Sequence, residues 1–322
     1  MKTFLQQLLL FIAGFVLLMA IGVLIPASRT ARESFLFSKI DKDSLLKNTP
    51  SPRIVLVGGS NTSFSINSQI LKDSLHLNPV NTGISGALGL LYMLDHSLDG
   101  IRPGDVVIVC PEYTQFYGDA AYGEDYLIRV IMETAPGEML KLRGKQLSTQ
   151  LAFLPRYAFS KFKLTQYLPR EESPGQEATL DEIVYKRVAF NQYGDMSRHW
   201  TMEKIDVAPY ARIDQRFNEQ AIDALYEYRK QVEARGAKLF VTFPAFQDES
   251  FANQRSQISR IEHSLKSKGF TLLGNPERYK MPDELIFDTP YHLTKAGAQI
   301  RTQLLIEDLR KANSSEIALK GF

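Results

Sequence analysis

The sequence of 322 residues contains a single cysteine, Cys110. One cysteine excludes an internal disulfide and any cysteine-rich metal site. Because Cys110 ends the apolar run VVIVC, we expect its thiol to pack in the core as a small hydrophobic group. A charge excess of one sign is also missing, since 38 Lys and Arg against 36 Asp and Glu give a net charge of +2. Proteins that neutralise many phosphates need a larger excess, so nucleic acid is not an expected partner.

After residue 25 the sequence has no apolar run long enough to cross a membrane. Residues 4–25, in contrast, carry no charge and are long enough to cross a hydrocarbon core as a helix. A cleaved signal peptide has a shorter apolar centre and a small-residue cleavage site, which the following PASRTA matches poorly. We therefore predict an uncleaved membrane anchor at residues 1–26. Charge alone leaves its orientation open, because Lys2 competes with Arg29 and Arg32.

Residues 27–52 are polar and end in a proline-rich step, which predicts a stalk leading to a domain at 53–322. In this domain, short runs typical of strands alternate with segments whose apolar residues recur every three or four positions. The alternation predicts an α/β fold, a three-layer α/β/α sandwich with a mostly parallel sheet. Strands are expected at 53–59, 79–84, 105–110, 237–243 and 270–274, and helices at 68–75, 86–98, 215–236 and 256–269.

One interval, at about 115–212, is far longer than an ordinary connection. We predict an insertion there that acts as a lid. It is rich in aromatic residues and holds the only tryptophan, Trp200. These aromatics either form the small core of the lid or line a cleft for a sugar.

Ser60 follows Gly58 and Gly59 at the end of the first predicted strand. Parallel sheets place their sites beyond the carboxyl ends of the strands. Near the end of the chain, Asp288 and His292 precede a helix that is predicted to begin at about 295. A serine on a glycine turn, followed late in the chain by an Asp and His pair, is the combination of a nucleophile, a base and its orienting carboxylate.

These blocks resemble the SGNH, or GDSL-like, hydrolase superfamily from about residue 53 to the end, excluding the insertion. The resemblance implies an SGNH-type, flavodoxin-like sandwich and a catalytic set of Ser60 as nucleophile, His292 as base and Asp288 as orienting carboxylate. It also implies an oxyanion hole built from the amides of Ser60 and Gly86, with Gly83 as the nearby alternative.

The sequence departs from the family pattern at three places. Gly59 replaces the aspartate of Gly-Asp-Ser, and Glu112 stands where an asparagine side chain donates to the oxyanion. An ionised carboxylate only accepts hydrogen bonds, so this part of the hole is absent or differently built. Asp288 precedes His292 with three residues between them instead of two, which makes the role of the carboxylate less certain than that of the histidine.

The blocks GGSNTSFSIN, NTGISGALGLLYML, PEYTQF, FNQYGD and DTPYHLTKAGAQIRT resemble a subgroup of bacterial membrane-anchored SGNH-like proteins. This subgroup occurs alongside membrane-bound O-acyltransferases in envelope-glycan modification and is distantly similar to alginate O-acetylation proteins. The resemblance implies a single-pass protein of the cytoplasmic membrane whose domain lies on the periplasmic side. It further implies a serine esterase or O-acyltransferase that acts on acyl, notably acetyl, esters of a glycan or glycolipid, with a membrane-bound O-acyltransferase as partner. Substrate-binding residues are expected at Asn61, Asn81, Gly83, Tyr113, Asn191, Asp195 and His199.

A second hypothesis stays open: an inactive SGNH-like module that binds a glycan or a partner protein, favoured by Glu112 and the shifted Asp288. Nucleotide binding is disfavoured because GGSNTS lacks the Gly-x-Gly-x-x-Gly spacing. No cofactor is expected, and no metal site either, since the remaining histidines show no ligand spacing.

Overall fold

A sheet of five parallel strands lies at the centre of the computed structural model, which describes residues 2–168 and 179–319. Its strand order is β2-β1-β3-β4-β6, the flavodoxin-like order, with every neighbouring pair parallel. The apolar runs predicted all five strands, and the α/β class is confirmed. The strands are β1 (Arg53–Gly58), β2 (Asn78–Asn81), β3 (Val106–Cys110), β4 (Lys238–Thr242) and β6 (Leu272–Leu273). The sequence did not predict the separate parallel pair β5 (Phe246–Gln247) and β7 (Lys280–Met281).

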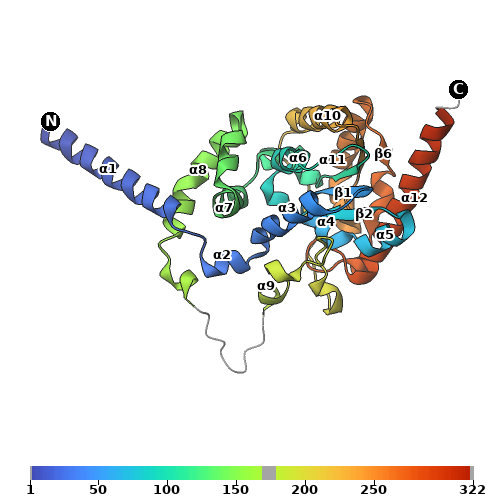
Figure 1. Cartoon of the computed structure of the whole chain (residues 1–322), viewed down its shortest axis with the longest axis horizontal. Helices are drawn as coiled ribbons and strands as arrows, with labels where there is room; N and C mark the ends of the chain where they lie inside the picture. The colour runs from blue at the N-terminus through green and yellow to red at the C-terminus, as the bar shows by residue number, and fades with distance from the viewer. Residues whose placement is uncertain (1, 169–178, 320–322) are drawn as a thin grey trace.

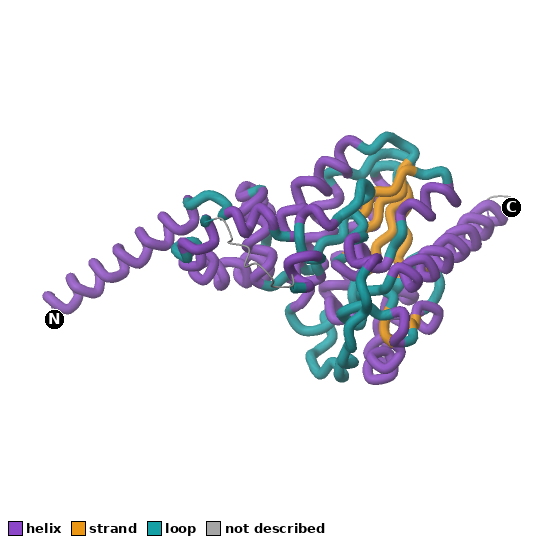
Figure 2. The backbone as a smooth tube through the Cα atoms, turned by 90° about the horizontal axis from the view of Figure 1, so that it is seen from below, coloured by secondary structure: helices purple, strands orange, loops and turns teal. Residues whose placement is uncertain are grey.

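Helices cover both faces of the sheet (Figures 1 and 2). Along β1, Val55 and Val57 belong to one hydrophobic cluster, and Ile54 and Leu56 belong to another. Successive side chains of a strand point to opposite faces, so these clusters are the two sides of a three-layer sandwich. The larger cluster is covered by α6 (Leu90–Leu98), α10 (Glu219–Ala234) and α11 (Asp248–Ser267), and the smaller by α5 (Ser68–Leu75) and α12 (Lys295–Leu319).

The helix boundaries differ from the predicted ones mainly at the amino ends. α10 begins four residues later than predicted, at Glu219, because the Asn218 side chain accepts from the amide of Gln220 and caps the helix there. α11 begins eight residues earlier, at Asp248, with an acidic first turn that suits the helix dipole. Both helices end before a glycine, Gly236 and Gly269, whose positive φ angles of 76° and 70° favour glycine.

Residues 27–52 do not form the stalk that their polarity predicted. They fold into α2 (Arg29–Glu33), a 3₁₀ helix (Phe35–Ser38) and α3 (Lys39–Asn48). Leu46 of α3 belongs to the larger hydrophobic cluster, and Lys39 and Lys42 are only 2% and 3% exposed. Because lysines are usually exposed to solvent, the sequence did not predict that this segment packs on the domain.

α1 (Lys2–Leu24) is the one helix in the described ranges that is long and apolar enough to cross a membrane. It projects away from the domain at the end of the molecule opposite to α12 (Figure 1). Most of its apolar side chains are exposed, as a helix that contacts lipid requires.

The predicted insertion at 115–212 is only partly a separate layer, and its residues 169–178 lie outside the described ones. α7 (Asp125–Thr134) places Leu127, Val130 and Ile131 in the larger cluster of the main core, and α8 (Gly144–Ser160) packs against α7. After α9 (Leu180–Ile183) the chain forms a small cluster around Phe64 and Phe287, near the ends of the strands. The segment that follows α9 is therefore the part that borders the site.

Candidate active site

Ser60 is presented by a tight turn between β1 and α4 (Ser60–Ser65). The turn needs glycine for space, because a Cβ on Gly58 would lie 2.7 Å from the Cys110 carbonyl oxygen. A Cβ on Gly59 would lie 2.7 Å from the backbone nitrogen of Gly86. The two glycines thus let three backbone segments meet at the carboxyl edge of the sheet, with the half-buried Ser60 among them.

Asp288 and His292 lie on a compact turn before α12. The turn is closed by the Phe287 amide donating to the His292 carbonyl over 2.8 Å and by the His292 amide donating to the Thr289 carbonyl over 3.0 Å. The turn accommodates the third residue between Asp288 and His292, because Asp288 Oδ1 still lies 2.7 Å from His292 Nδ1. The carboxylate holds Nδ1 and leaves Nε2 as the nitrogen that can exchange a proton.

Two aromatic side chains that the sequence did not single out fix this pair. The Tyr185 hydroxyl donates to Asp288 Oδ2 over 2.5 Å, and the Phe64 ring stacks on the His292 imidazole at 3.8 Å between centroids and 8° between planes. Phe64 is four residues after Ser60 in α4, so the same helix carries the serine and the surface on which the imidazole rests. The four-residue spacing from Ser60 could have predicted Phe64 as a site residue. Tyr185 comes from the inserted interval, where no sequence pattern indicated it.

The electrostatics of Asp288 favour its ionised form. Burial raises the pKa of this carboxyl, but the hydrogen bonds and charge of His292, together with the Tyr185 hydroxyl, outweigh burial and hold the pKa below its usual value. An ionised carboxylate in this position can stabilise a positive charge on the imidazole.

Ser60, Asp288 and His292 line one cavity of about 610 Å³. Among the hydrogen bonds of the described residues, none joins Ser60 directly to His292, which is common in sites that tighten when substrate binds. The remaining walls include residues of α2, of the 3₁₀ helix after it, of α7 and of the segment after α9, namely Thr30, Ser34, Phe35, Tyr126 and Tyr185. The segment predicted to be a stalk therefore forms part of the wall. Two aromatics of the inserted interval, Phe116 and Tyr117, pack in the main core of the domain instead of the separate lid core that was one of their predicted roles. Tyr126 and Tyr185 line the cavity.

Glu112 lies against the backbone at the place where an oxyanion hole is expected. Its carboxylate contacts the positions where Gly59 and Gly86 would carry a Cβ, and Oε1 accepts from the Asn61 amide at 3.5 Å. Burial raises the pKa of Glu112, and the charge of His292 and the bonds from Asn61 and Ser60 lower it only in part. A raised pKa favours the protonated carboxyl, which can donate a hydrogen bond. Among the described ion pairs, none joins Glu112 to an arginine of the insertion.

The residues expected to bind substrate do not line this cavity. Asp195 is buried and accepts from the Ser68 amide and hydroxyl, from Asn81 and from Asn191. Asn61 bonds to the Gly59 amide and to the Cys110 carbonyl, and Gly83 packs against the Gly59 carbonyl oxygen. Their contacts are those of residues that hold the turn after β1 and the insertion in place.

Tyr113 and His199 are also buried. The ring of Tyr113 packs on Phe246, and its hydroxyl has no hydrogen-bond partner. His199 bonds through Nε2 to the Leu293 carbonyl over 2.8 Å, and burial lowers its pKa to about 4. A neutral, buried imidazole of this kind supports the chain that carries His292.

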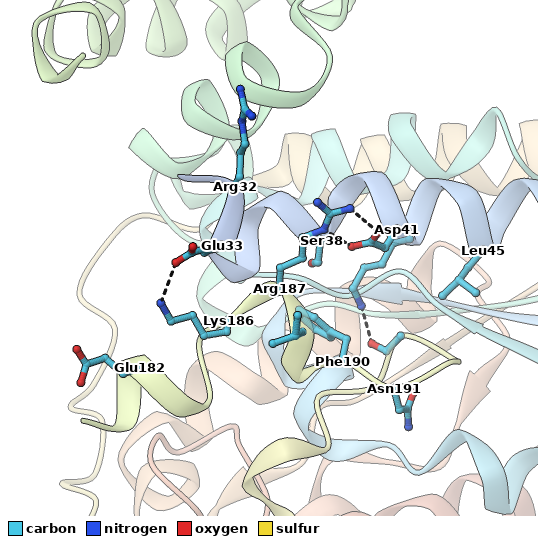
Figure 3. A pocket seen from close by; sticks show the side chains of 13 residues that line it. Arg32, Glu33, Ser38, Asp41, Leu45, Glu182, Lys186, Arg187, Phe190 and Asn191 are labelled. Atoms are coloured by element: carbon cyan, nitrogen blue, oxygen red, sulfur yellow. Dashed lines mark hydrogen bonds and ion pairs between the residues drawn. The ribbon is translucent and has the colours of Figure 1, made fainter. Parts of the chain in front are cut away.

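A second cavity, of about 670 Å³, borders the first and shares Glu182 and Lys186 with it (Figure 3). In its wall, Arg187 binds Asp41 through two hydrogen bonds of 2.7 Å. Lys42 donates to the Gly194 carbonyl over 2.6 Å, and burial lowers the pKa of its ammonium to about 7. This wall carries four basic side chains and three acidic ones, so its net charge is small, which suits a polar ligand without a strong net charge.

Residues 2–168 and 179–319 contain no group of three His, Cys, Asp or Glu side chains that can hold a metal ion. The buried Cys110 thiol has a raised pKa because of burial, as expected for a core cysteine.

Comparison with known proteins identifies no family for this chain, since no protein-family profile and no curated protein matches it. Among solved structures, protein YxiM of Bacillus subtilis is similar to it, with a TM-score of 0.36 and 14% sequence identity. The match covers 82% of this chain and 57% of YxiM, so the chain spans little more than half of that protein. A likeness of this size carries no information about activity.

Proposed function

We propose that this protein is an SGNH-type serine esterase or O-acyltransferase that acts on acyl esters of a cell-envelope glycan. The observation that carries the proposal is the Asp288–His292 hydrogen bond of 2.7 Å beside a cavity that Ser60 also lines. A buried carboxylate that holds one nitrogen of an imidazole, in a cavity that a serine on a glycine turn also lines, is the set of groups that a nucleophilic site needs.

In this mechanism Ser60 Oγ attacks the ester carbonyl carbon while His292 Nε2 takes the hydroxyl proton. Collapse of the tetrahedral intermediate breaks the bond to the leaving alkoxide, which receives the same proton from His292. The acyl group is then bound to Ser60. Water or a sugar hydroxyl then attacks the acyl carbon and gives its proton to His292. His292 returns a proton to Ser60 Oγ as the second tetrahedral intermediate breaks the bond between Oγ and the acyl carbon. Asp288, held by Tyr185, stabilises the imidazolium in both halves.

The oxyanion is stabilised by the amides of Ser60 and Gly86 and by the protonated carboxyl of Glu112. Glu112 supports this role because its carboxyl lies against Gly59 and Gly86 and its pKa is raised. The same residue favours the second candidate, an inactive binding module, if its carboxyl stays ionised, because a negative charge there repels the oxyanion.

The proposal includes a substrate, which the two cavities support, and a location, which the resemblance of the sequence implies. The catalytic cavity and the neighbouring polar cavity share residues, so a chain of sugars can extend from one into the other. α1 is long and apolar enough to anchor the protein in a membrane, which supports the proposed anchor. The resemblance of the sequence implies that this is the cytoplasmic membrane, that the domain lies on the periplasmic side and that a membrane-bound O-acyltransferase is a partner.

The experiment is hydrolysis of an activated acetyl ester by the full chain in detergent. Ser60→Ala and His292→Ala should each remove the acetate release above background, with unchanged melting temperatures. A folded native protein that binds glycan but releases no acetate would support the binding module instead.

A further inference from the structure

α1 is not an isolated rod, because its second half packs on the carboxyl-terminal end of α8. Gly22 lies so close to Ala158 that a Cβ on Gly22 would overlap the Ala158 backbone. The Phe15 and Phe159 rings are 5.4 Å apart between centroids. Figure 1 shows the two helices meeting at this point.

The Phe15 contact fixes the depth of α8 relative to the anchor. Phe15 precedes the end of α1 at Leu24 by about 14 Å along the helix axis. Helical side chains also tilt toward the amino terminus, which takes the Phe15 ring further from Leu24. If α1 spans a bilayer, a ring in contact with Phe15 therefore lies below the level at which the chain leaves the membrane.

The surface around this contact is apolar and uncovered. The Phe162 ring is 6.3 Å from that of Phe159, and both side chains are 39% exposed. In the next 3₁₀ helix (Leu164–Tyr167) and just after it, Leu164 and Leu168 are 75% and 62% exposed. Exposed aromatic and leucine side chains side by side are unfavourable in water and favourable at a membrane surface.

The charged residues of this segment fit a membrane surface as well. Lys161 lies between the two phenylalanines in sequence, but its side chain is 2% exposed and pairs with Glu133 at 2.6 Å inside the protein. The charge of Lys161 is therefore kept away from lipid. Arg156 and Lys163 are exposed, and such basic side chains reach toward anionic headgroups.

We propose that the end of α8 and the 3₁₀ helix after it, residues 159–168, insert into the lipid bilayer beside α1 as a second membrane contact. The inference rests on the membrane anchor of the proposed function, but not on its chemistry. Two contacts hold the domain in one orientation, whereas a single helix leaves it free to rotate. The orientation is relevant to the site, because Thr30 and Ser34 line both the catalytic cavity and a smaller one bordered by Tyr157 and Lys161 next to this segment.

The test places an environment-sensitive fluorophore on single introduced cysteines of the full chain. The protein is reconstituted in vesicles of phosphatidylethanolamine and phosphatidylglycerol that contain lipids with a quencher on the acyl chain. Phe162→Cys reports on the proposed contact, and Leu164→Cys repeats it at a more exposed position. The native Cys110 is buried, which directs labelling to the introduced thiol.

Two further positions make the result decisive. Ile300→Cys on α12 is the matched control, since Ile300 is an apolar side chain 42% exposed. Figure 1 shows α12 at the end of the molecule opposite to α1. Leu10→Cys reports on the anchor itself. The expected result is blue-shifted emission and loss of fluorescence to the lipid quencher at Leu10, Phe162 and Leu164, with neither at Ile300. Quenching at Leu10 without quenching at Phe162 and Leu164 would overturn the second contact and leave the anchor. Absence of quenching at Leu10 would overturn both.

Discussion

Two buried carboxylates, Asp288 and Asp195, were both expected at the site, but they differ in their hydrogen-bond partners and in the direction of their pKa shifts. Asp195 accepts four hydrogen bonds from amide and hydroxyl groups that do not titrate near neutral pH. Burial dominates there and raises its pKa. Asp288 is bound by an imidazole and a phenol, and their hydrogen bonds lower its pKa despite burial.

The difference shows that burial alone does not tell whether a carboxylate has a structural or a catalytic role. The cluster around Asp195 is closed and joins the insertion to α5 and β2. The cluster around Asp288 ends at an imidazole that faces a cavity with Ser60. A carboxylate is therefore a catalytic candidate here because its partner can exchange a proton with a ligand.

Replacing each carboxylate by its amide should lower the rate in one case and the stability in the other, and these are the largest effects expected. Asp288→Asn should slow ester hydrolysis by about 100-fold or more because the imidazolium loses its counter-charge, with little change in stability. Asp195→Asn should lower the free energy of unfolding by about 2–3 kcal/mol, since an NH₂ group would face other donors. Denaturant titrations and rates of both variants check this, and a stable, inactive Asp195→Asn protein would contradict the distinction.

Glu112 should make activity depend on its protonated form. The rate of the native protein is expected to fall by about 100-fold as pH rises through the raised pKa of Glu112, because the third oxyanion donor is lost. In Glu112→Gln, whose amide donates at every pH, this alkaline decline should disappear. Identical pH–rate profiles for the two proteins would exclude the donor role.

His199 and His292 both contact the Phe64 ring, but His199 is expected to affect the stability of the protein. The folded pKa of His199 is about 4, below its unfolded value, so the unfolded chain binds more protons and stability is lost as pH falls from 6.5 to 4. The loss at pH 5 should be about 2 kcal/mol relative to pH 7. His199→Phe should flatten this part of the stability profile, measured by chemical denaturation. A slope that persists in the variant would assign the pH effect to other groups.

Removing the Tyr185 hydroxyl should have the smallest effect. Tyr185→Phe takes one of two side-chain donors from Asp288, and the rate is expected to fall about fivefold, as for the loss of one hydrogen bond. The pKa of Asp288 should rise at the same time, which NMR titration of the carboxyl can follow. An unchanged rate with a shifted pKa would reduce Tyr185 to a purely structural contact.

The central strands were predictable because their apolar runs, such as RIVLVG and VVIVC, are too long and too regular for loops. The two-residue strands β5 and β7 carry no such pattern. The packing of α3 was hidden because its buried side chains include Lys39 and Lys42. Lys39 pairs with Asp43 of the same helix and also with the distant Glu138, and Lys42 donates to the distant carbonyls of Asn81 and Gly194. A local pattern cannot reveal a partner that the fold supplies from elsewhere.

The same limit applies to the site. The places of Ser60, Asp288 and His292 follow from a glycine turn after a strand and a loop before a helix, both visible in the sequence. The enclosure of Asp195 depends on the distant residues Ser68 and Asn81 and on the nearby Asn191, and the polarity of all three is equally compatible with substrate binding. The three-dimensional structure shows that these groups form hydrogen bonds with one another.

Covalent labelling of Ser60 tests the central claim most directly. The full chain should react with a serine-directed phosphonate, and mass spectrometry should find the adduct on the peptide that contains Ser60. Ser60→Ala and His292→Ala should abolish labelling, because the nucleophile and its base act as a unit. Asp195→Glu, a conservative change in the closed cluster, serves as the control that should retain labelling in its folded fraction. An adduct at another residue, or no adduct on a folded native protein, would contradict a nucleophilic site at Ser60.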